Sequence, residues 1–197
     1  MTKTDLLHDF ITTQNGGYIT HKDAVEMGYG ANALRTLIKN GKLYKAGEGV
    51  YAQPHILEDP FFEYSVRFSR GIFSLNTALY LRDMSDRTPI KYDMSFPVNY
   101  GTANLPDDIV PFRESSKTYG IGAETVNTPA GNKVKCYSVE RTLCDIVRPV
   151  NKLDRAIVVA AFKYYVRNMK QDIGKLFAYA KLLGVNEKIS SYMEVLQ

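Results

Sequence analysis

The 197-residue chain is poor in the side chains that most often bind metals or form covalent cross-links, with two cysteines and three histidines. Cys136 and Cys144 are not in CxxC spacing and have no histidine nearby, so the pattern predicts neither a zinc site nor a structural disulfide. We expect both to be ordinary thiols of a hydrophobic core. His8, His21 and His55 all precede the cysteines by a long stretch of chain, which argues against a Cys–His catalytic pair.

Long apolar runs are also lacking. The longest, residues 156–162, is far shorter than the roughly 20 residues of a membrane-spanning helix. Near the beginning, Lys3 is mixed with Asp5 and Asp9, which is not the pattern of a signal peptide. Because 45% of the residues are apolar, the chain can bury a real core. We therefore expect a soluble, cytoplasmic protein with no membrane partner.

Clusters of catalytic groups are scarce as well. Two carboxylate pairs, Asp83 with Asp86 and Asp107 with Asp108, lie beside turn-forming residues and have no histidine near them, so loop surface is the simpler interpretation. The Gly-Ile-Gly step at 120–122 lacks the following glycine and helix of a nucleotide-binding fingerprint. An enzyme is the weakest of the functional hypotheses, and we predict no catalytic residue, metal or cofactor.

The net charge of +4 is unevenly distributed along the chain. Residues 1–55 contain six Lys+Arg and five Asp+Glu, residues 56–132 seven and ten, and residues 133–197 twelve and six. The basic excess at the C-terminal end is typical either of a surface that meets an acidic partner or of solvated helices.

Apolar periodicity predicts three helices near the N-terminus. The first covers residues 4–14 and is followed by a scrap of strand. The second is short, residues 21–27, with Thr20 as its N-cap. The third covers residues 31–40 and ends at Gly41.

Two short strands follow directly, residues 42–45 and 50–52, around the glycine-bearing turn 46–49. Three helices and then a hairpin are the order of elements in a winged helix-turn-helix. We therefore expect a winged helix-turn-helix DNA-binding domain over residues 1–55 and a second domain over residues 60–197.

The remaining chain mixes helix and strand signals and ends in helices only. The expected fold class is α+β, with an N-terminal winged helix-turn-helix and a mixed α/β C-terminal domain that ends in a helical bundle. Its expected helices are 60–70, 75–82 with Ser74 as cap, 139–147, 152–168, 172–183 and 187–196; its expected strands are 91–98, 125–127 and 133–137, the last two forming a hairpin.

The third helix is expected to turn Leu34, Leu37 and Ile38 inward and its polar side chains outward. Such side chains suit the major groove, since arginine pairs with guanine, asparagine with adenine, and the threonine methyl touches the thymine methyl. Lysines on the first wing strand would contact phosphates. The predicted DNA-binding residues are Thr20, Asn32, Arg35, Thr36, Lys39, Lys42 and Lys45. The alternative is a solvated helix of a protein-interaction module.

Two segments resemble the AbiEi family of antitoxins. Residues 33–43, followed by Gly49-Val50-Tyr51, look like the recognition helix and wing of the family's N-terminal module. Residues 137–145 are similar to the S-x-E-R-T-L-x-D segment that begins the family's C-terminal helices. From the residues themselves, we expect Ser138 to cap this helix and Arg141 to pair with the carboxylate four positions later.

The resemblance implies an antitoxin of a type IV toxin-antitoxin system with a role in phage defence by abortive infection. The N-terminal domain would bind double-stranded promoter DNA, at inverted repeats, and repress its own operon. The C-terminal domain would counteract a nucleotidyltransferase-like toxin, without forming a stable complex with it.

Four basic residues of the expected helix 152–168 share one arc: Lys152, Arg155, Lys163 and Arg167. They form either a polyanion-binding patch or a solubilising face. The main alternative function is a stand-alone transcriptional regulator that responds to a small ligand, which requires an apolar pocket with a few convergent polar groups.

Overall fold

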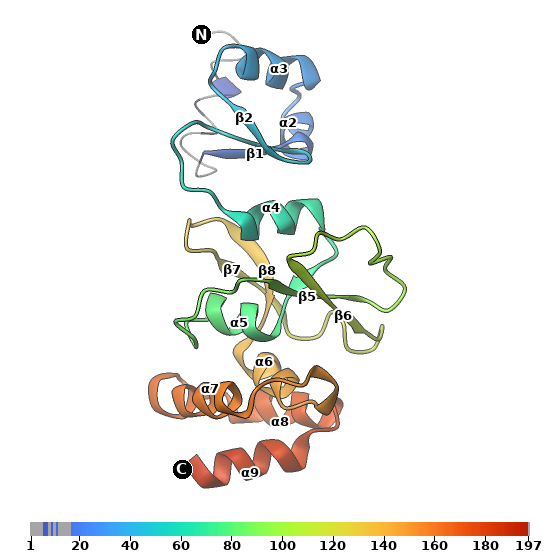
Figure 1. The fold of residues 1–197 in the computed structure, drawn as a ribbon, viewed down its shortest axis with the longest axis vertical. Helices are drawn as coiled ribbons and strands as arrows, with labels where there is room; N and C mark the ends of the chain where they lie inside the picture. The colour runs from blue at the N-terminus through green and yellow to red at the C-terminus, as the bar shows by residue number, and fades with distance from the viewer. Residues whose placement is uncertain (1–5, 8, 10, 12–16, 197) are drawn as a thin grey trace. The chain divides into compact units, whose positions relative to one another are not determined.

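The chain is a mixed α+β protein with two sheets in a computed structural model (Figure 1). The structure describes residues 6–7, 9, 11 and 17–196. The chain divides into two compact units. The first consists of Met1–Ser69 with Asn127–Val134, and the second of Arg70–Val126 with Lys135–Gln197.

The first unit contains a three-stranded antiparallel sheet in the order β1-β3-β2. Of the predicted helix 4–14, the described positions 6, 7, 9 and 11 are helical, and the rest lies outside the described residues. The other elements are β1 (Tyr18–Thr20), α2 (His21–Glu26), α3 (Ala31–Lys39), β2 (Tyr44–Gly47), β3 (Val50–Ala52) and α4 (Pro60–Arg67).

Both faces of this small sheet are covered, because successive strand residues point to opposite sides. Ile19 and Tyr51 pack with the residues of α2 and α3. Tyr18, Val50 and Ala52 pack on the other face with apolar residues of α4. The unit therefore continues past the predicted boundary at 55–60, since α4 completes its second core.

Asp59 ties this unit to the turn between two distant strands. Its side chain is 2% exposed and accepts the backbone N–H of Phe62 at 3.1 Å, as the N-cap of α4. It also accepts hydrogen bonds from Thr128 Oγ1 at 2.5 Å and Asn132 Nδ2 at 2.8 Å. Charge-assisted bonds to a buried carboxylate explain why Asn127–Val134 belongs to the first unit.

The second unit contains a five-stranded mixed sheet in the order β6-β5-β4-β8-β7. Strand β4 is antiparallel to β5 and parallel to β8, and β5 is parallel to β6. The elements are β4 (Ile72–Phe73), α5 (Leu75–Leu81), β5 (Tyr92–Pro97), β6 (Ile109–Glu114), β7 (Ala123–Asn127), β8 (Lys133–Tyr137), α6 (Val139–Ile146), the 3-10 turn η1 (Pro149–Asn151), α7 (Arg155–Asn168), α8 (Ile173–Leu182) and α9 (Asn186–Leu196).

Ser74 occupies the N-cap position of α5, as predicted, but its hydroxyl makes no capping hydrogen bond. Asp93 of β5 takes this role across the sheet. Its carboxylate accepts the backbone N–H and the side-chain amide of Asn76, each at 3.0 Å. A carboxylate is the stronger acceptor for the free N–H groups at a helix start, which accounts for the exchange.

Helices α6 to α9 share one apolar core with α5. Helix α7 begins at Arg155 rather than at the predicted Lys152, because Lys152 has a left-handed backbone with φ 48° and Asp154 is the N-cap. In the part of the chain that the structure describes, no helix has the length and hydrophobicity to cross a membrane.

Candidate nucleic-acid interface

Helix α3 buries Leu34 and Leu37, which are 2% and 0% exposed. Ile38, which we predicted on the same side, is 37% exposed. It follows Leu37 by one position and lies near the helix end, at the edge of the apolar stripe. The buried face of α3 therefore includes Leu34 and Leu37 but not Ile38, which the sequence had placed there.

The predicted polar side of α3 lies at the surface. Asn32, Arg35, Thr36 and Lys39 are all exposed. Thr36 Oγ1 donates a hydrogen bond to the backbone carbonyl of Asn32 at 2.8 Å, so its hydroxyl proton is used within the helix. An outside partner of Thr36 would meet its methyl group and its hydroxyl lone pairs.

The turn between α2 and α3 fixes where this polar side points. Gly28 has a left-handed backbone with φ 79°, which glycine adopts at little cost. The Tyr29 N–H then donates to the carbonyl of Ala24 at 2.8 Å. Met27 and Tyr29 pack against the core of the unit, so both helix ends at this turn are anchored.

Lys42 and Lys45 are both exposed, which the predicted contact with phosphates requires. Strand β2 begins at Tyr44 and runs to Gly47, two residues later than predicted, with an irregular register against β3 after Lys45. Lys42 therefore lies before the strand, while Lys45 lies on it. The sequence from 27 to 47 holds four Lys+Arg and no Asp or Glu.

Glu48, at the tip of the hairpin, directly follows this acid-free stretch. Its side chain is 81% exposed and lies 3.8 Å from Arg67 Nε. An exposed ion pair of this kind is weak, but it places a positive charge beside the acid. A phosphate near the hairpin tip would therefore be repelled less by Glu48 than by an unpaired carboxylate.

Thr20 differs from the other predicted DNA-binding residues. Its hydroxyl accepts the Asp23 N–H at 2.9 Å, and the Asp23 carboxylate accepts the Thr20 N–H at 3.2 Å. This is the predicted N-cap of α2, in the form of a capping box. The residue is only 8% exposed, so we assign it a structural role and leave it out of the candidate interface.

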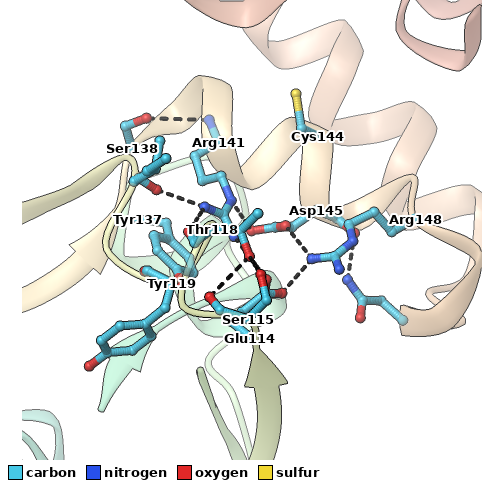
Figure 2. A network of polar contacts seen from close by, with 12 residues as sticks. Glu114, Ser115, Thr118, Tyr119, Tyr137, Ser138, Arg141, Cys144, Asp145 and Arg148 are labelled. Atoms are coloured by element: carbon cyan, nitrogen blue, oxygen red, sulfur yellow. Dashed lines mark hydrogen bonds and ion pairs between the residues drawn. The ribbon is translucent and has the colours of Figure 1, made fainter. Parts of the chain in front are cut away.

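The second unit contains a buried network of charges around Arg141 of α6 (Figure 2). Arg141 is fully buried. Its Nε lies 2.9 Å from Asp145 Oδ2, and its Nη1 donates to the backbone carbonyls of Thr118 and Ile121 at 2.6 and 2.7 Å. The guanidinium also lies over the Tyr137 ring, 4.2 Å from its centre.

Glu114 closes this network from strand β6. Its carboxylate lies 3.5 Å from Arg141 Nη2, accepts Thr118 Oγ1 at 2.7 Å and pairs with Arg148. Arg148 also lies 3.2 Å from Asp145. Two buried acids are thus matched by two arginines. The pairing of Arg141 with Asp145 was predicted; Glu114 was missed, because no local pattern links residues 27 positions apart.

The role of this network is structural. Ser138 Oγ accepts the Arg141 N–H at 3.3 Å and caps α6, as predicted. Cys144 points away from the charges in Figure 2, and burial raises the pKa of its thiol to about 12. Cys136 is likewise a buried free thiol. Both cysteines are core residues, as the sequence predicted.

The predicted basic patch is exposed at all four positions, Lys152, Arg155, Lys163 and Arg167. Lys152 and Arg155 line a cavity of about 570 Å³ beside α7 and α9, and the other two do not. Lys152 is separated from the helical stripe by its left-handed backbone. Lys152 and Arg155 therefore belong to the edge of this cavity, whereas Lys163 and Arg167 lie elsewhere on α7.

No group of three or more potential metal ligands occurs among the described residues. His21 and His55 are exposed, and His8 lies outside the described residues. Gly122 of the 120–122 step lies against the Arg141 side chain. These positions suggest no catalytic cluster in the described part of the chain.

No model of a known protein family matches the chain, and a search of curated proteins finds no match either. The likeness of residues 33–51 and 137–145 to antitoxins is therefore a matter of short motifs.

Proposed function

We propose that the chain is a DNA-binding antitoxin of the AbiEi type, which represses its own promoter and counteracts a nucleotidyltransferase-like toxin. The observation that carries the DNA-binding part is the exposed polar side of α3. It presents Asn32, Arg35, Thr36 and Lys39 on a helix of nine residues without an acidic side chain.

The proposed fold of this part is a winged helix-turn-helix. Its support is the order β1-α2-α3-β2-β3, in which two short helices precede an antiparallel hairpin. Helix α3 would be the recognition helix and β2-β3 the wing. The anchored turn at Gly28 and the buried Leu34 and Leu37 hold α3 with its polar side outward.

In the proposed complex, Arg35 and Asn32 read base edges in the major groove. Lys39, Lys42 and Lys45 neutralise phosphates, which adds affinity without sequence preference. One short helix offers few base contacts, so binding at repeated sites is needed to compete with genomic DNA. This requirement agrees with the inverted repeats that the resemblance implies.

Gel-shift titration with the DNA upstream of the gene, and with a random duplex of equal length, tests this part. We expect tighter binding to the upstream DNA, with a steep loss of affinity as salt is raised. Equal affinity for the two duplexes would refute the proposed role as a specific repressor.

The antitoxin activity is assigned to the second unit, on the strength of the resemblance at residues 137–145. A fragment covering 60–197 would not isolate this unit, because α4 and Asn127–Val134 belong to the first. The test therefore uses full-length protein, co-expressed with the gene encoded directly downstream. Wild type and Arg35→Ala are both expected to restore growth, because only DNA binding is lost in the variant.

Growth that is not impaired by the downstream gene would contradict the antitoxin assignment. Loss of rescue in Arg35→Ala, at equal protein level, would contradict the division of the two activities between the units. Copurification of the two proteins through gel filtration would contradict the expected lack of a stable complex.

The cavity beside α7 favours the second candidate, a stand-alone regulator that responds to a small ligand. Its lining combines apolar and basic side chains, the combination that such a sensor needs. The co-expression experiment separates the two candidates, because a stand-alone regulator gives no rescue from a toxin.

A further inference from the structure

A cavity in the second unit, which we call the α7–α9 cavity, has an apolar lining and a basic edge. Its volume of about 570 Å³ falls within the range of small-molecule sites. Most of the lining is apolar, and the basic residues in it are Arg148, Lys152, Arg155 and Lys188.

We propose that the α7–α9 cavity binds a small amphipathic anion, a carboxylate or phosphate head on an apolar body. The site belongs to the second unit, whereas α3 belongs to the first. The proposal rests on the lining of the cavity and does not depend on DNA binding or on antitoxin activity. Such a ligand needs positive charge for its head and an apolar wall for its body, and different residues of the lining provide the two.

The positive charge is not balanced within the lining, which contains four basic side chains and no acidic one. Arg148 is matched by Glu114 and Asp145 in the buried network. Lys188 Nζ donates to the backbone carbonyl of Val147 at 3.1 Å, which leaves its charge uncompensated. The cavity therefore keeps an excess of positive charge after its internal contacts are counted.

Lys152 and Arg155 are the two cations best placed to meet a ligand. Both are exposed, and within the described residues neither makes an ion pair or a side-chain hydrogen bond. The acids on neighbouring stretches of chain, Asp154, Glu187 and Glu194, are exposed but do not line the cavity. An anion at this edge would be paired without displacing an existing partner.

Part of the apolar lining is accessible to solvent. Val195 is 82% exposed although it lies on α9 beside a hydrophobic core. Leu153, Val159, Tyr192 and Leu196 are only partly buried. Covering this surface with the hydrocarbon part of a ligand removes apolar area from water, which is favourable. An inorganic anion has no apolar surface to bury and would not gain this free energy.

Isothermal titration of the full-length protein with decanoate, and separately with decyl phosphate, tests the site. Decan-1-ol has the same apolar body without charge, and acetate and inorganic phosphate have the head alone. We expect saturable binding at one site for at least one of the two amphiphiles, tighter by about tenfold or more than for decan-1-ol or the bare anions. The tighter of the two amphiphiles identifies the preferred head.

Two pairs of variants show where the ligand binds. The double variant Lys152→Gln with Arg155→Gln is expected to weaken binding by about tenfold or more. The control, Lys163→Gln with Arg167→Gln, changes exposed basic residues of α7 that do not line the cavity and should leave binding unchanged. Val195→Asp, which puts a carboxylate in the lining, is expected to abolish binding. The control Val150→Asp changes a valine that is 70% exposed and does not line the cavity.

All of these positions are exposed, so the variants should fold, and far-UV circular dichroism checks this. The absence of saturable binding by both amphiphiles would overturn the proposal. Equal affinity for decan-1-ol would remove the role of charge, and equal losses in the control variants would mean non-specific attraction to a basic surface; either result also overturns it.

Discussion

Arg141 shows how one residue organises much of the second unit. It contacts α6, strand β6 and the chain between β6 and β7, through Asp145, Glu114 and two backbone carbonyls. A buried arginine is tolerated because its charge is matched and most of its donors are used. The E-R-T-L sequence at residues 140–143 is therefore explained by the structural role of Arg141.

Replacing Arg141 with methionine should lower the free energy of unfolding by about 3 to 5 kcal/mol, because two buried carboxylates lose a partner. Urea denaturation measures the change. The control is Arg87→Met at an exposed position, expected to change stability by about 0.5 kcal/mol or less. A small effect at Arg141 would mean that Arg148 alone is sufficient to balance Glu114 and Asp145.

Gly122 lies against this same arginine. Its backbone is left-handed, with φ 78°, and an added Cβ would lie 2.8 Å from Arg141 Cβ. Strain and overlap together should make Gly122→Ala about 2 to 4 kcal/mol less stable by urea denaturation. Gly120→Ala is the matched control, since nothing lies within 4 Å of its added Cβ. Similar costs at both glycines would contradict this account.

At the scale of residues, the sequence predicted contacts between near neighbours and missed distant ones. The N-cap role of Thr20 and the pairing of Arg141 with Asp145 follow from helix geometry alone. The partners of Asp59 lie about 70 positions away, at Thr128 and Asn132, and depend on the tertiary fold. No local pattern carries such information.

At the scale of elements, Thr20 is the N-cap of α2, as predicted, but its structural role replaces the DNA contact that was also predicted for it. Thr20→Ala removes the capping hydrogen bond of α2 and should lower the free energy of unfolding by about 1 kcal/mol. Thr20→Ser keeps the cap and should cost less. DNA affinity of folded Thr20→Ala should equal that of wild type in the gel shift; a selective loss of affinity would restore Thr20 to the interface.

The start of α4 carries a local excess of acid. Burial, and then the nearby carboxylates of Glu58 and Asp59, raise the pKa of Glu63, and Arg67 opposes them. Because the folded pKa lies above the unfolded value, the folded state holds the proton more tightly, and stability falls as the pH rises between the two values.

Glu63→Gln should therefore gain thermal stability relative to wild type as the pH rises above about 4, the ordinary range of a glutamate. Thermal melts at several pH values up to neutral measure the difference. Glu194→Gln, an exposed acid of α9, is the control and should show no such trend. A difference in Tm that does not change with pH would contradict the proton linkage.

Periodic segments and the N-terminal hairpin were predictable, whereas strands β4 and β6 were not. The strand 133–137 and the helices 139–147, 172–183 and 187–196 were found to within a residue or two. The two-residue strand β4 has no alternation to recognise, and β6 mixes apolar with charged residues around a proline. Their pairing with distant strands is what makes them strands.

At the scale of the whole molecule, the sequence indicated a division into two parts but placed it too early. The end of the predicted hairpin, and Pro54 and Pro60 on either side of a short linker, indicated a boundary near 55–60. The contacts instead assign α4 and the segment Asn127–Val134 to the first unit. Because both join through buried contacts with sheet residues and Asp59, composition alone did not reveal them.

The proposed function depends most on α3 being a surface that reads DNA. Fluorescence anisotropy with upstream and random duplexes, across a salt series, tests it through Arg35→Ala and Lys42→Ala. Arg35→Ala should weaken binding to the upstream duplex by about 1 to 3 kcal/mol and leave the random duplex nearly unaffected. Lys42→Ala should weaken both alike and reduce the salt slope by about 1. Equal losses on both duplexes for Arg35→Ala would contradict the claim that α3 reads sequence.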